Sequence, residues 1–580
     1  AKELIVSRGY MSSVSHTLTF GLGNNARIEC AEIIWPDGSL QVVSDLKVNQ
    51  LNTFNYQKDS LQKNTPDESS NSLFTSAPFP YQHVDSAFND FDKQLLLPHK
   101  LSQIGPALAT ADVNGDGLED LFLGGGKGQP AQLLLANPSG KFTPQLVPDL
   151  EQDRNYEDVG AHFFDADSDG DTDLYVVSGS YEFDEGSTDL EDRLYLNSGN
   201  GQFSRTENTL PKMYTAGSVV KSADFDADGD LDLFVGGRVV PGKYLVPPTS
   251  YILENSGGKF NIKTTEVAPE LEKIGMVTDA VWKDINKDGE ADLLVTGEWM
   301  GIEVFINKNG QLTKSDLYQG LSEHVGWWNK LLVEDVDQDG DVDIVAGNLG
   351  LNHKFKASAE KPLHVYTDDF DENGRMDIVL AKYYDTKLVP VRGKGCTSQK
   401  MPFISDKFEK YRDFANADLK GIFGDKIENS LHVEVTEFRS GIFLNEGEAF
   451  FRFVPFANEA QTAPINSILY QDFNADGAKD LLLAGNNHMT EVETTRYDAG
   501  IGVLLQSDGQ GSFHFVSNQE TGLYLDKDVR AIEVLQNGKG KQLIVANNNS
   551  VHQLFWVNFG QQEQLSLLLN KISDEEDLRQ

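Results

Sequence analysis

A nine-residue loop of the form D-x-[DN]-x-[DN]-G-x-x-D occurs seven times in this chain of 580 residues, and an apolar segment follows each copy. Side-chain oxygens at positions 1, 3 and 5 converge on one point, because the glycine at position 6 permits a sharp turn. Hard cations such as Ca²⁺ prefer oxygen ligands of this kind. The pattern therefore predicts up to seven structural calcium sites. The copies begin at Asp112, Asp165, Asp224, Asp284, Asp335, Asp369 and Asp472.

Two other interpretations of the loop are disfavoured by its composition. An EF-hand needs a bidentate Glu at position 12, but that position is apolar in every copy, and an Asp at position 9 takes over its role. A solvated hairpin without metal explains one isolated copy, but the seven copies together hold 30 of the 90 acidic residues. Several carboxylates in one tight loop repel one another unless a cation lies between them.

The residues that we expect to bind the metal occupy positions 1, 3, 5, 7 and 9. An Asn at position 3 or 5 ligates through an uncharged carbonyl oxygen, so the four copies that carry one are expected to bind calcium more weakly. The predicted set is Asp112, Asn114, Asp116, Leu118 and Asp120; Asp165, Asp167, Asp169, Asp171 and Asp173; Asp224, Asp226, Asp228, Asp230 and Asp232; Asp284, Asn286, Asp288, Glu290 and Asp292; Asp335, Asp337, Asp339, Asp341 and Asp343; Asp369, Asp371, Asn373, Arg375 and Asp377; and Asp472, Asn474, Asp476, Ala478 and Asp480.

The segments around each loop are typical of short strands. The residues after position 9 are β-branched or large and apolar, as in LFLGGG and LYVVSG, and the residues upstream, such as 217–223, are also strand-like. Each loop is therefore predicted to join two strands. The first four spacings between loops, 53, 59, 60 and 51 residues, suit one four-stranded propeller blade each.

Three features modify this simple count. The Asp369 loop follows its predecessor by only 34 residues and is predicted to join the outer strands of the blade begun at Asp335. The next gap, of 103 residues, contains a predicted helical insertion at 393–425, with its helical core near 400–425. After Asp472, one more strand–turn–strand segment continues the repeat. Its turn contains Gly538 and Gly540 in place of the acidic ligands. The sequence thus predicts an all-β, seven-bladed β-propeller.

A ring of blades must close, because exposed edge strands pair with other chains. We expect residues 95–109 to lie against the terminal strands near 555–558, so that the first and last parts of the propeller share one blade. An open solenoid is the competing geometry.

The N-terminal region is predicted to be a separate small β-rich domain over residues 1–57. Residues 17–20 alternate like a strand, and 28–35 with 40–43 form a predicted hairpin turning at Pro36-Asp37-Gly38. The polar residues 58–73 are predicted to be a linker. The propeller is assigned to 74–560 and a C-terminal tail to 561–580.

The composition limits the partners. The net charge is −41, and it stays near −27 with seven Ca²⁺ bound, which argues against nucleic acid or an anionic membrane surface as a partner. The sequence has no apolar run long enough for a transmembrane segment. Cys30 and Cys396 are far apart and are expected to be free, buried thiols. The start at Ala1, without a signal peptide, suggests a processed or excised form.

The repeat, followed by segments such as YLNSGNGQF at 195–203 and LENSGGKF at 253–260, resembles the FG-GAP/VCBS repeat family, whose propellers include the integrin alpha-subunit head. The N-terminal pattern of GLG at 21–23, WPDG at 35–38 and NQ at 49–50 resembles the ASPIC/UnbV domain. The combination is similar to bacterial surface or secreted VCBS-repeat proteins and, more distantly, to cartilage acidic protein. The resemblance implies calcium binding and interaction rather than catalysis, and a chain that is part of a larger protein.

We therefore expect a calcium-binding, non-catalytic module for a protein or glycan partner at the cell surface, extracytoplasmic or secreted. One alternative is a carbohydrate-active lyase or hydrolase, with Arg392 and Tyr411 lining a cleft. Another is an accessory subunit of an outer-membrane complex. Indoles beside amides suit sugar or peptide recognition, although the same residues also suit packing between blades and capping of strand ends. The candidate ligand surface is Trp299, Trp327, Trp328, Asn329, Asn348, Asn352 and Asn487.

Overall fold

The computed structural model describes residues 72–558 without a gap. In the N-terminal region it describes residues 4, 13, 15–21, 27–28, 30–36, 39–44, 46–56 and 62–63. The chain divides into two compact units, residues 1–71 and 72–580.

The described part of the first unit is a small antiparallel sheet. Strands β1 (Cys30–Ile34) and β2 (Ser39–Ser44) pair with Ile34 opposite Leu40, which confirms the predicted hairpin. A third strand, β3 (Gln62–Lys63), pairs with β2, so the predicted linker is wrong at these two residues. Residues 17–20 are not a strand, because four alternating residues suit an extended loop equally well. The predicted tail at 561–580 and most of 57–71 lie outside the described residues.

The second unit contains seven four-stranded antiparallel sheets, called the ring sheets below, that follow one another along the chain. The first three consist of β5 (Leu108–Ala111), β6 (Asp120–Leu123), β7 (Gln132–Ala136) and β8 (Phe142–Gln145); β9 (Asp158–Phe164), β10 (Asp173–Ser178), β11 (Arg193–Asn197) and β12 (Phe203–Arg205); and β13 (Ala216–Ala223), β14 (Asp232–Val239), β15 (Tyr251–Asn255) and β16 (Phe260–Ile262).

The other four ring sheets keep the same pattern. They consist of β17 (Met276–Lys283), β18 (Asp292–Met300), β19 (Ile302–Lys308) and β20 (Gln311–Lys314), with β21 (Gly326–Trp327) beside β18; β22 (Lys330–Glu334), β23 (Asp343–Gly347), β28 (Gly441–Asn445) and β29 (Phe451–Pro455); β30 (Ser467–Gln471), β31 (Asp480–Ala484), β32 (Val503–Ser507) and β33 (Phe513–Val516); and β34 (Val529–Asn537), β35 (Gly540–Asn547), β36 (Gln553–Val557) and β4 (Phe74–Ala77).

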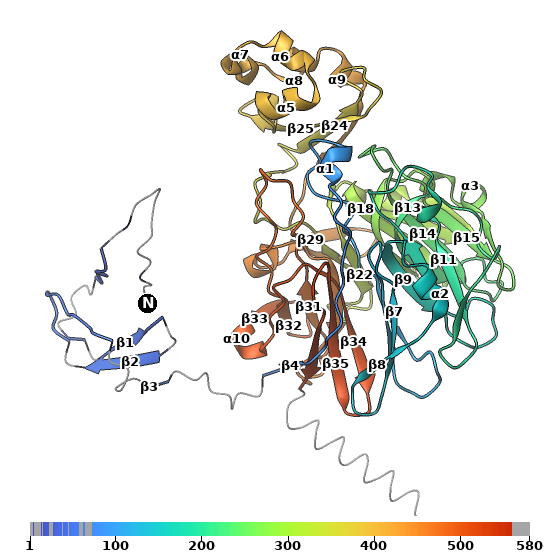
Figure 1. Ribbon diagram of the computed structural model, residues 1–580, viewed down its shortest axis with the longest axis horizontal. Coiled ribbons are helices and arrows are strands. Elements are labelled where there is room, and N and C mark those ends of the chain that lie inside the picture. Colours follow the sequence, from blue (N-terminus) through green and yellow to red (C-terminus); the bar gives the residue numbers. More distant parts are fainter. Residues whose placement is uncertain are drawn as a thin grey trace, which may run out of the picture. The chain divides into compact units, whose positions relative to one another are not determined.

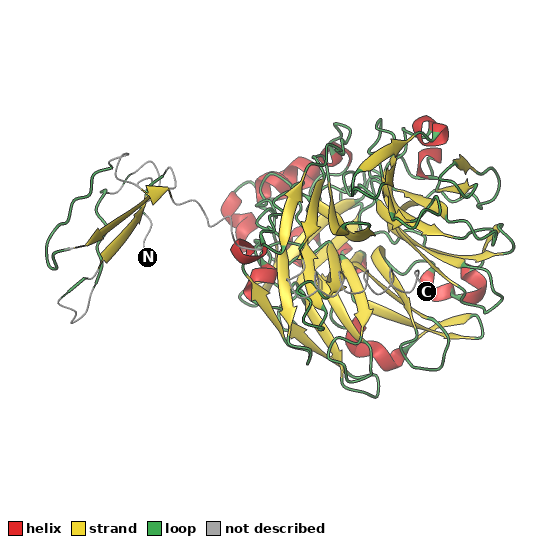
Figure 2. Ribbon diagram, turned by 90° about the horizontal axis from the view of Figure 1, so that it is seen from below, coloured by secondary structure: helices red, strands yellow, loops and turns green. Residues whose placement is uncertain are grey.

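The first strands of the ring sheets contact one another in a closed cycle. Strand β5 contacts β9, the contacts continue through β13, β17, β22, β30 and β34, and β34 contacts β5. Four-stranded sheets arranged side by side around an axis form a β-propeller, and Figures 1 and 2 show this arrangement from two directions. The alternative of an open solenoid is wrong for this unit.

The cycle closes through a strand from the start of the unit. Strand β4 pairs antiparallel with β36, so that Phe74 is opposite Val557 and Ala77 is opposite Leu554. The expectation that the first and last parts share one sheet is confirmed. The expected segment, 95–109, is wrong, because it ends in β5 (Leu108–Ala111), which is the first strand of the next sheet.

Residues 348–440 interrupt one ring sheet between β23 and β28 and form what we call the inserted module, which carries the labels α5 to α9 in Figure 1. Its sheet has the order β26-β25-β24-β27. The Asp369 loop joins β24 to β25 in this separate sheet, so the prediction that it joins outer strands of a ring sheet is wrong. The predicted helical insertion is confirmed. The elements are β24 (Leu363–Asp368), β25 (Asp377–Tyr384), β26 (Lys387–Pro390), α5 (Lys394–Lys400), α6 (Phe403–Lys407), α7 (Tyr411–Asn416), α8 (Leu419–Phe423), α9 (Lys426–Asn429) and β27 (Leu431–Val435).

Short helices occupy connections elsewhere in the second unit. No helix among the described residues is long and apolar enough to cross a membrane. These helices are α1 (Asp90–Lys93), α2 (Pro148–Gln152), α3 (Thr264–Val267), α4 (Gln319–Ser322) and α10 (Asn518–Thr521), with 3₁₀ turns η2 (Thr188–Leu190), η3 (Pro269–Leu271), η4 (Asp316–Tyr318) and η5 (Asn458–Gln461).

The apolar core lies mainly between neighbouring sheets. One cluster, for example, packs Phe122 and Leu133 of one ring sheet against Leu174 and Tyr195 of the next. Both described cysteines are free, as predicted, but Cys30 is exposed on β1 and Cys396 is half-buried. The expectation that both thiols are buried is therefore wrong.

Candidate metal-binding sites

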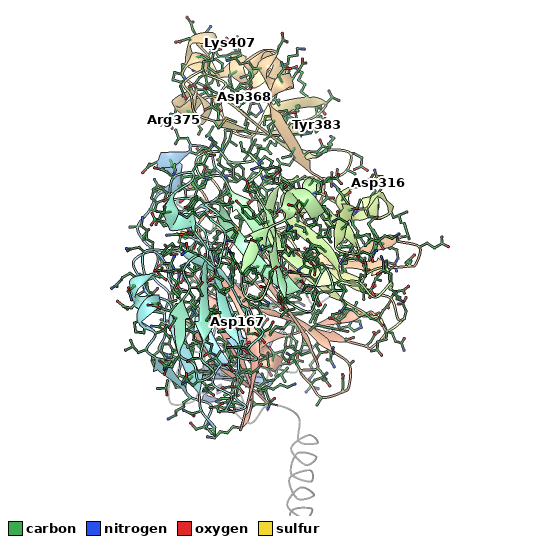
Figure 3. All side chains as sticks on the ribbon, turned by 90° about the vertical axis from the view of Figure 1, so that its right-hand side faces the viewer. Asp167, Asp316, Asp368, Arg375, Tyr383 and Lys407 are labelled. Atoms are coloured by element: carbon green, nitrogen blue, oxygen red, sulfur yellow. The ribbon has the colours of Figure 1, made fainter. Side chains whose placement is uncertain are left out.

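Each aspartate loop joins two adjacent strands, as the sequence predicts. Six loops connect the first and second strands of ring sheets, and the seventh connects β24 to β25. Figure 3 places Asp167 on the propeller and Asp368 and Arg375 on the inserted module. Six loops thus occupy equivalent positions around the ring, and the seventh lies on the inserted module.

The first aspartate of each loop holds the turn. In all seven copies one carboxylate oxygen accepts a hydrogen bond from the backbone N–H of the glycine at position 6, as in Asp112 to Gly117 at 2.8 Å and Asp165 to Gly170 at 3.0 Å. That glycine has a positive φ in every copy, for example 90° at Gly170, a conformation that side chains with a Cβ disfavour. The sequence pattern therefore specifies the local backbone.

Other oxygens of the loops lack partners. Oδ1 of Asp165, Asp335 and Asp371 is buried and accepts no hydrogen bond from any described residue. In the Asp165 loop, carboxylate oxygens of Asp165, Asp167 and Asp173 all lie within 4.8 Å of one another, and the Asp224 and Asp335 loops contain similar groups. Unpaired buried oxygens are costly, and converging carboxylates suit a hard cation. The residues present therefore fit calcium.

The aspartate at position 9 has a second role, because it is buried and hydrogen-bonded to the backbone. Oδ2 of Asp173 accepts from the N–H of Ala166 at 2.9 Å, and Oδ1 accepts from the N–H of Asn197 on β11 at 2.8 Å. Burial and, to a smaller extent, the neighbouring carboxylates raise the pKa of Asp173 to about 6 despite these hydrogen bonds. The same causes raise the pKa of Asp232 to about 7.

Asparagines on the third strands connect neighbouring ring sheets. The Asn197 side chain donates to the backbone carbonyl of Val113 in the preceding loop at 2.8 Å, and Asn255 donates to Ala166 at 2.9 Å in the same way. These are the asparagines of the YLN and LEN segments noted in the sequence. Each of these asparagines therefore joins the third strand of its own sheet to the aspartate loop of the preceding sheet.

The Asp369 copy differs from the six others. Oδ1 of Asp377 lies 3.0 Å from Nζ of Lys400, whereas the equivalent oxygen in each ring sheet accepts a backbone N–H. Position 7 of this copy is Arg375. Two cations near one loop compete with a metal for its carboxylates.

The predicted aromatic ligand surface is not open to solvent. Trp299 and Trp327 are only 5% and 3% exposed, their rings are 5.2 Å apart, and they lie in the apolar cluster between the ring and the inserted module. Trp328 is fully buried in a different cluster and donates from Nε1 to the carbonyl of His324. The prediction that these indoles form an open recognition surface is wrong, because the indoles fill the space between sheets.

The amides predicted to accompany those indoles are separated from one another. Asn348 is fully buried, accepts from the N–H of Trp327 and donates to the carbonyl of Glu437, so it caps strand ends. Asn329 and Asn487 are half-buried, and Asn352 is exposed.

The two residues proposed for a catalytic cleft differ in exposure and in partners. Arg392 is 6% exposed and forms ion pairs with Glu491 at 2.7 Å and Glu493 at 3.2 Å. Tyr411 is 68% exposed, and Lys394 lies over its ring. Arg392 is therefore committed to carboxylate partners rather than to a substrate.

The propeller axis contains a cavity of about 420 Å³ lined by the first strands of the ring sheets. Its charged lining residues are Lys221, Arg238, Asp279, Lys330, Arg530 and Glu533. Lys330 and Asp279 form an ion pair at 3.1 Å, and burial raises the pKa of Glu533. The cavity is thus polar, with more cationic than acidic side chains in its lining.

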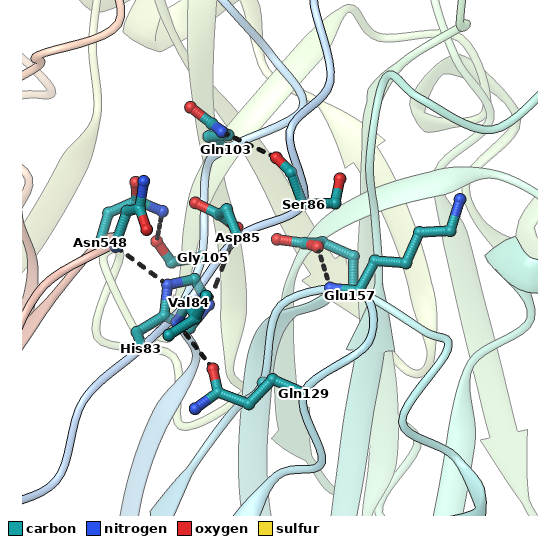
Figure 4. Close-up of polar contacts among 12 residues, drawn as sticks. His83, Val84, Asp85, Ser86, Gln103, Gly105, Gln129, Glu157 and Asn548 are labelled. Atoms are coloured by element: carbon teal, nitrogen blue, oxygen red, sulfur yellow. Dashed lines mark hydrogen bonds and ion pairs between the residues drawn. The ribbon is translucent and has the colours of Figure 1, made fainter.

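A second buried cluster contains His83, Asp85 and Glu157 (Figure 4). Nδ1 of His83 accepts the N–H of Asn549 at 3.1 Å, so the proton of the neutral ring is on Nε2, the nitrogen that faces Asp85. A protonated nitrogen cannot ligate a metal. Burial raises the pKa of both carboxyl groups, and the two are in hydrogen-bond contact. A shared proton therefore satisfies this pair without a metal.

A third cluster, His364, His432 and Glu434 on the inserted module, was not identified from the sequence. Burial lowers the pKa of both imidazoles, so both are neutral at pH 7. The local signal was the His-x-Glu alternation at 432–434, which places both side chains on one face of a strand. The third residue, His364, is 68 positions away along the chain, and only strand pairing brings it close.

Comparisons with known proteins agree with the repeats. The family described as FG-GAP-like repeat matches residues 112–176, 177–235 and 284–346, and the family described as ASPIC and UnbV matches residues 1–61. A search of the curated proteins gave no match.

Solved structures similar to this chain come from several organisms. The V. cholerae biofilm matrix protein Bap1 is 12% identical with a TM-score of 0.33, covering 83% of this chain and 91% of its own. The Bacillus licheniformis rhamnogalacturonan lyase PL11 is 9% identical with a TM-score of 0.33, covering 84% of this chain and 76% of its own. Saccharomyces cerevisiae Sqt1 is 12% identical with a TM-score of 0.37, covering 83% of this chain and 99% of its own. Values this low carry no information about what this chain binds. On these matches, the chain carries an ASPIC/UnbV domain over residues 1–61 and FG-GAP-like repeats between residues 112 and 346.

Proposed function

We propose that this protein is a calcium-stabilised, seven-bladed propeller that acts outside the cytoplasm as a non-catalytic binding or assembly module. The observation that carries the proposal is the set of buried carboxylate oxygens without partners, Oδ1 of Asp165 and of Asp335, each beside further carboxylates of its own loop. In this proposal each ring sheet is one blade. The sheet containing β34 has a hairpin at Gly538 in place of the metal loop.

The loops differ in expected affinity. The three loops with Asp at positions 1, 3, 5 and 9 place the most charge around the ion, and those with Asn at position 3 place less. The Asp369 loop is the weakest in this proposal, because the Lys400 ammonium already lies against Asp377.

The extracytoplasmic location follows from the expected affinity. Extracellular calcium modules bind with dissociation constants of about 10⁻⁴ to 10⁻³ M, which suits the calcium concentration outside cells better than that of the cytosol. The partner in this proposal is a protein or a glycan that contacts the loops or a mouth of the propeller.

Thermal unfolding with and without calcium tests the structural role of the metal. At a free concentration of about 100 times the dissociation constant, each independent site adds roughly 2.7 kcal/mol to the free energy of unfolding. We expect the full chain to melt at a much lower temperature in excess EGTA and to recover when calcium is restored. An equal melting temperature in both buffers excludes structural calcium.

A glycan array and a polysaccharide turnover assay on the calcium-loaded protein test the non-catalytic role. Binding without new reducing ends or unsaturated products supports a module. Turnover of any polysaccharide contradicts it and favours a carbohydrate-active enzyme.

A further inference from the structure

We propose that His364, His432 and Glu434 form a binding site for a divalent transition-metal ion of the zinc type on the inserted module. The site is separate from the aspartate loops and lies beyond residue 346, where the FG-GAP matches end. The proposal does not depend on calcium binding or on the partner of the propeller.

Strand pairing brings the three side chains to one face of the inserted sheet. Strands β24 and β27 are antiparallel, with His364 directly opposite Glu434 and Tyr366 opposite His432. Direct cross-strand neighbours and their diagonal neighbours lie within reach of long side chains. The register of the sheet therefore assembles a site from residues that are distant in the sequence.

The distances between the ligand atoms suit one small ion. Nδ1 of His364 lies 2.9 Å from Nε2 of His432 and 3.3 Å from Oε2 of Glu434. In a tetrahedral zinc site with bonds of about 2.0 to 2.2 Å, neighbouring ligand atoms are separated by about 3.3 Å. These two distances are close to the separation of bound ligands, and ligand atoms of all three residues lie within 4.8 Å of one another.

The nitrogen atoms that face the site interact with side chains alone among the described residues. Nδ1 of His364 contacts Nε2 of His432 and Oε2 of Glu434, and neither nitrogen is bonded to the backbone in the described residues. The contact between the two nitrogens is a hydrogen bond, so one of them carries a proton, and a metal binds there once that ring holds its proton on its other nitrogen. His83 differs, because a backbone N–H bonded to its Nδ1 holds the proton on the nitrogen that faces Asp85.

The chemistry of the donor set selects the class of metal. Two imidazoles and one carboxylate suit zinc and similar ions, whereas calcium prefers oxygen ligands alone. Three protein ligands leave a fourth position open. The His364 side chain is 7% exposed and Glu434 is 45% exposed, so the open position faces solvent and is available to water or to a group from another molecule.

The rings around the site limit its motion. The ring of Tyr366 is stacked on His432 at 4.3 Å with an interplanar angle of 11°, and Tyr383 meets His364 edge-on at 5.5 Å. Figure 3 shows Tyr383 on the inserted module. Aromatic neighbours that hold the imidazoles in place lower the entropic cost of binding an ion.

Metal titration of the full chain tests the proposal, with Zn²⁺ by calorimetry and Co²⁺ by visible absorption, in the presence of millimolar calcium to fill the aspartate loops. Loss of an outer-shell partner alone reduces metal affinity about 10- to 100-fold. We therefore expect His432→Gln and Glu434→Gln each to weaken zinc binding by about 100-fold or more and to remove the cobalt absorption of a histidine-ligated site.

The control is His514→Gln, which replaces an exposed histidine on β33 far from the cluster in sequence. This variant is expected to bind zinc as the unchanged protein does. Because His432 and Glu434 are partly exposed, their variants should keep the melting temperature of the parent. Zinc and cobalt titrations that coincide for the parent, His432→Gln and Glu434→Gln overturn the proposal and place the bound metal outside this cluster.

Discussion

At the scale of single residues, aspartates of one loop have different roles that the sequence alone does not separate. Asp173 is 1% exposed and accepts two backbone N–H groups, whereas Asp169 is exposed and accepts only the nearby N–H of Asp171. Asp173 therefore stabilises the fold with or without a cation. Asp169 has no comparable role unless a metal is bound.

Alanine substitutions at these two positions are expected to separate the roles. Without calcium at neutral pH, Asp173→Ala should lower the free energy of unfolding by about 2 to 4 kcal/mol, because two buried N–H groups lose their acceptors. Asp169→Ala should change it by less than about 0.5 kcal/mol but should reduce the additional stability that calcium provides. Chemical denaturation of both variants with and without calcium measures this. Equal losses for both variants in the absence of calcium contradict the assignment.

At the scale of elements, one short strand closes the ring. Strand β4 has four residues and pairs along its length with β36, and Phe74 is 1% exposed in the cluster between two ring sheets. The strand is separated from its partner by almost the whole propeller sequence. Its position therefore depends on the assembled ring rather than on local propensity.

Truncation of Phe74 is expected to destabilise the closed ring. Phe74→Ala should cost about 3 to 5 kcal/mol, as for other buried phenylalanines. Ser76→Ala, at an exposed position of the same strand, is the matched control and should be nearly neutral. Urea unfolding of the two variants provides the comparison, and a loss below about 1 kcal/mol for Phe74→Ala is inconsistent with closure by β4.

At the scale of the whole molecule, the proposed function makes protons and calcium compete for the same carboxylates. Burial raises the pKa of Asp120, Asp292, Asp343 and Asp480 to about 6, as it does in the Asp173 loop. In the metal-free protein, carboxyl groups with raised pKa values stabilise the folded state at low pH, and this contribution is lost as the pH rises through the folded pKa. Calcium requires the deprotonated form.

The increase in melting temperature caused by calcium is therefore expected to become smaller as the pH falls from about 7.5 to about 5. Buried histidines such as His162 and His552, whose pKa values burial lowers to about 4, destabilise the protein in acid, but they contribute equally with and without calcium. The difference between the melting temperatures with and without calcium therefore reports the effect of the carboxylates alone. A calcium effect of the same size at both pH values contradicts a role for these aspartates.

The sequence by itself determined the parts of this protein that depend on neighbouring residues. The loop motif specifies a glycine turn, the apolar segments specify strands on either side, and the WPDG segment specifies the hairpin between β1 and β2, because each depends on backbone geometry over a few positions. The order of six aspartate loops and one plain hairpin around the ring also followed from their spacing.

Only the tertiary structure decided which distant segments meet. Strand β4, not the segment at 95–109, completes the last sheet; the Asp369 loop belongs to a sheet of its own; and Trp327 packs inside rather than facing a ligand. His364 joins His432 and Glu434 through the register of β24 on β27. These pairings are selected by burial and hydrogen bonding in the whole assembled structure. Because each segment could pair with many others, a local sequence pattern does not predict which pairing forms.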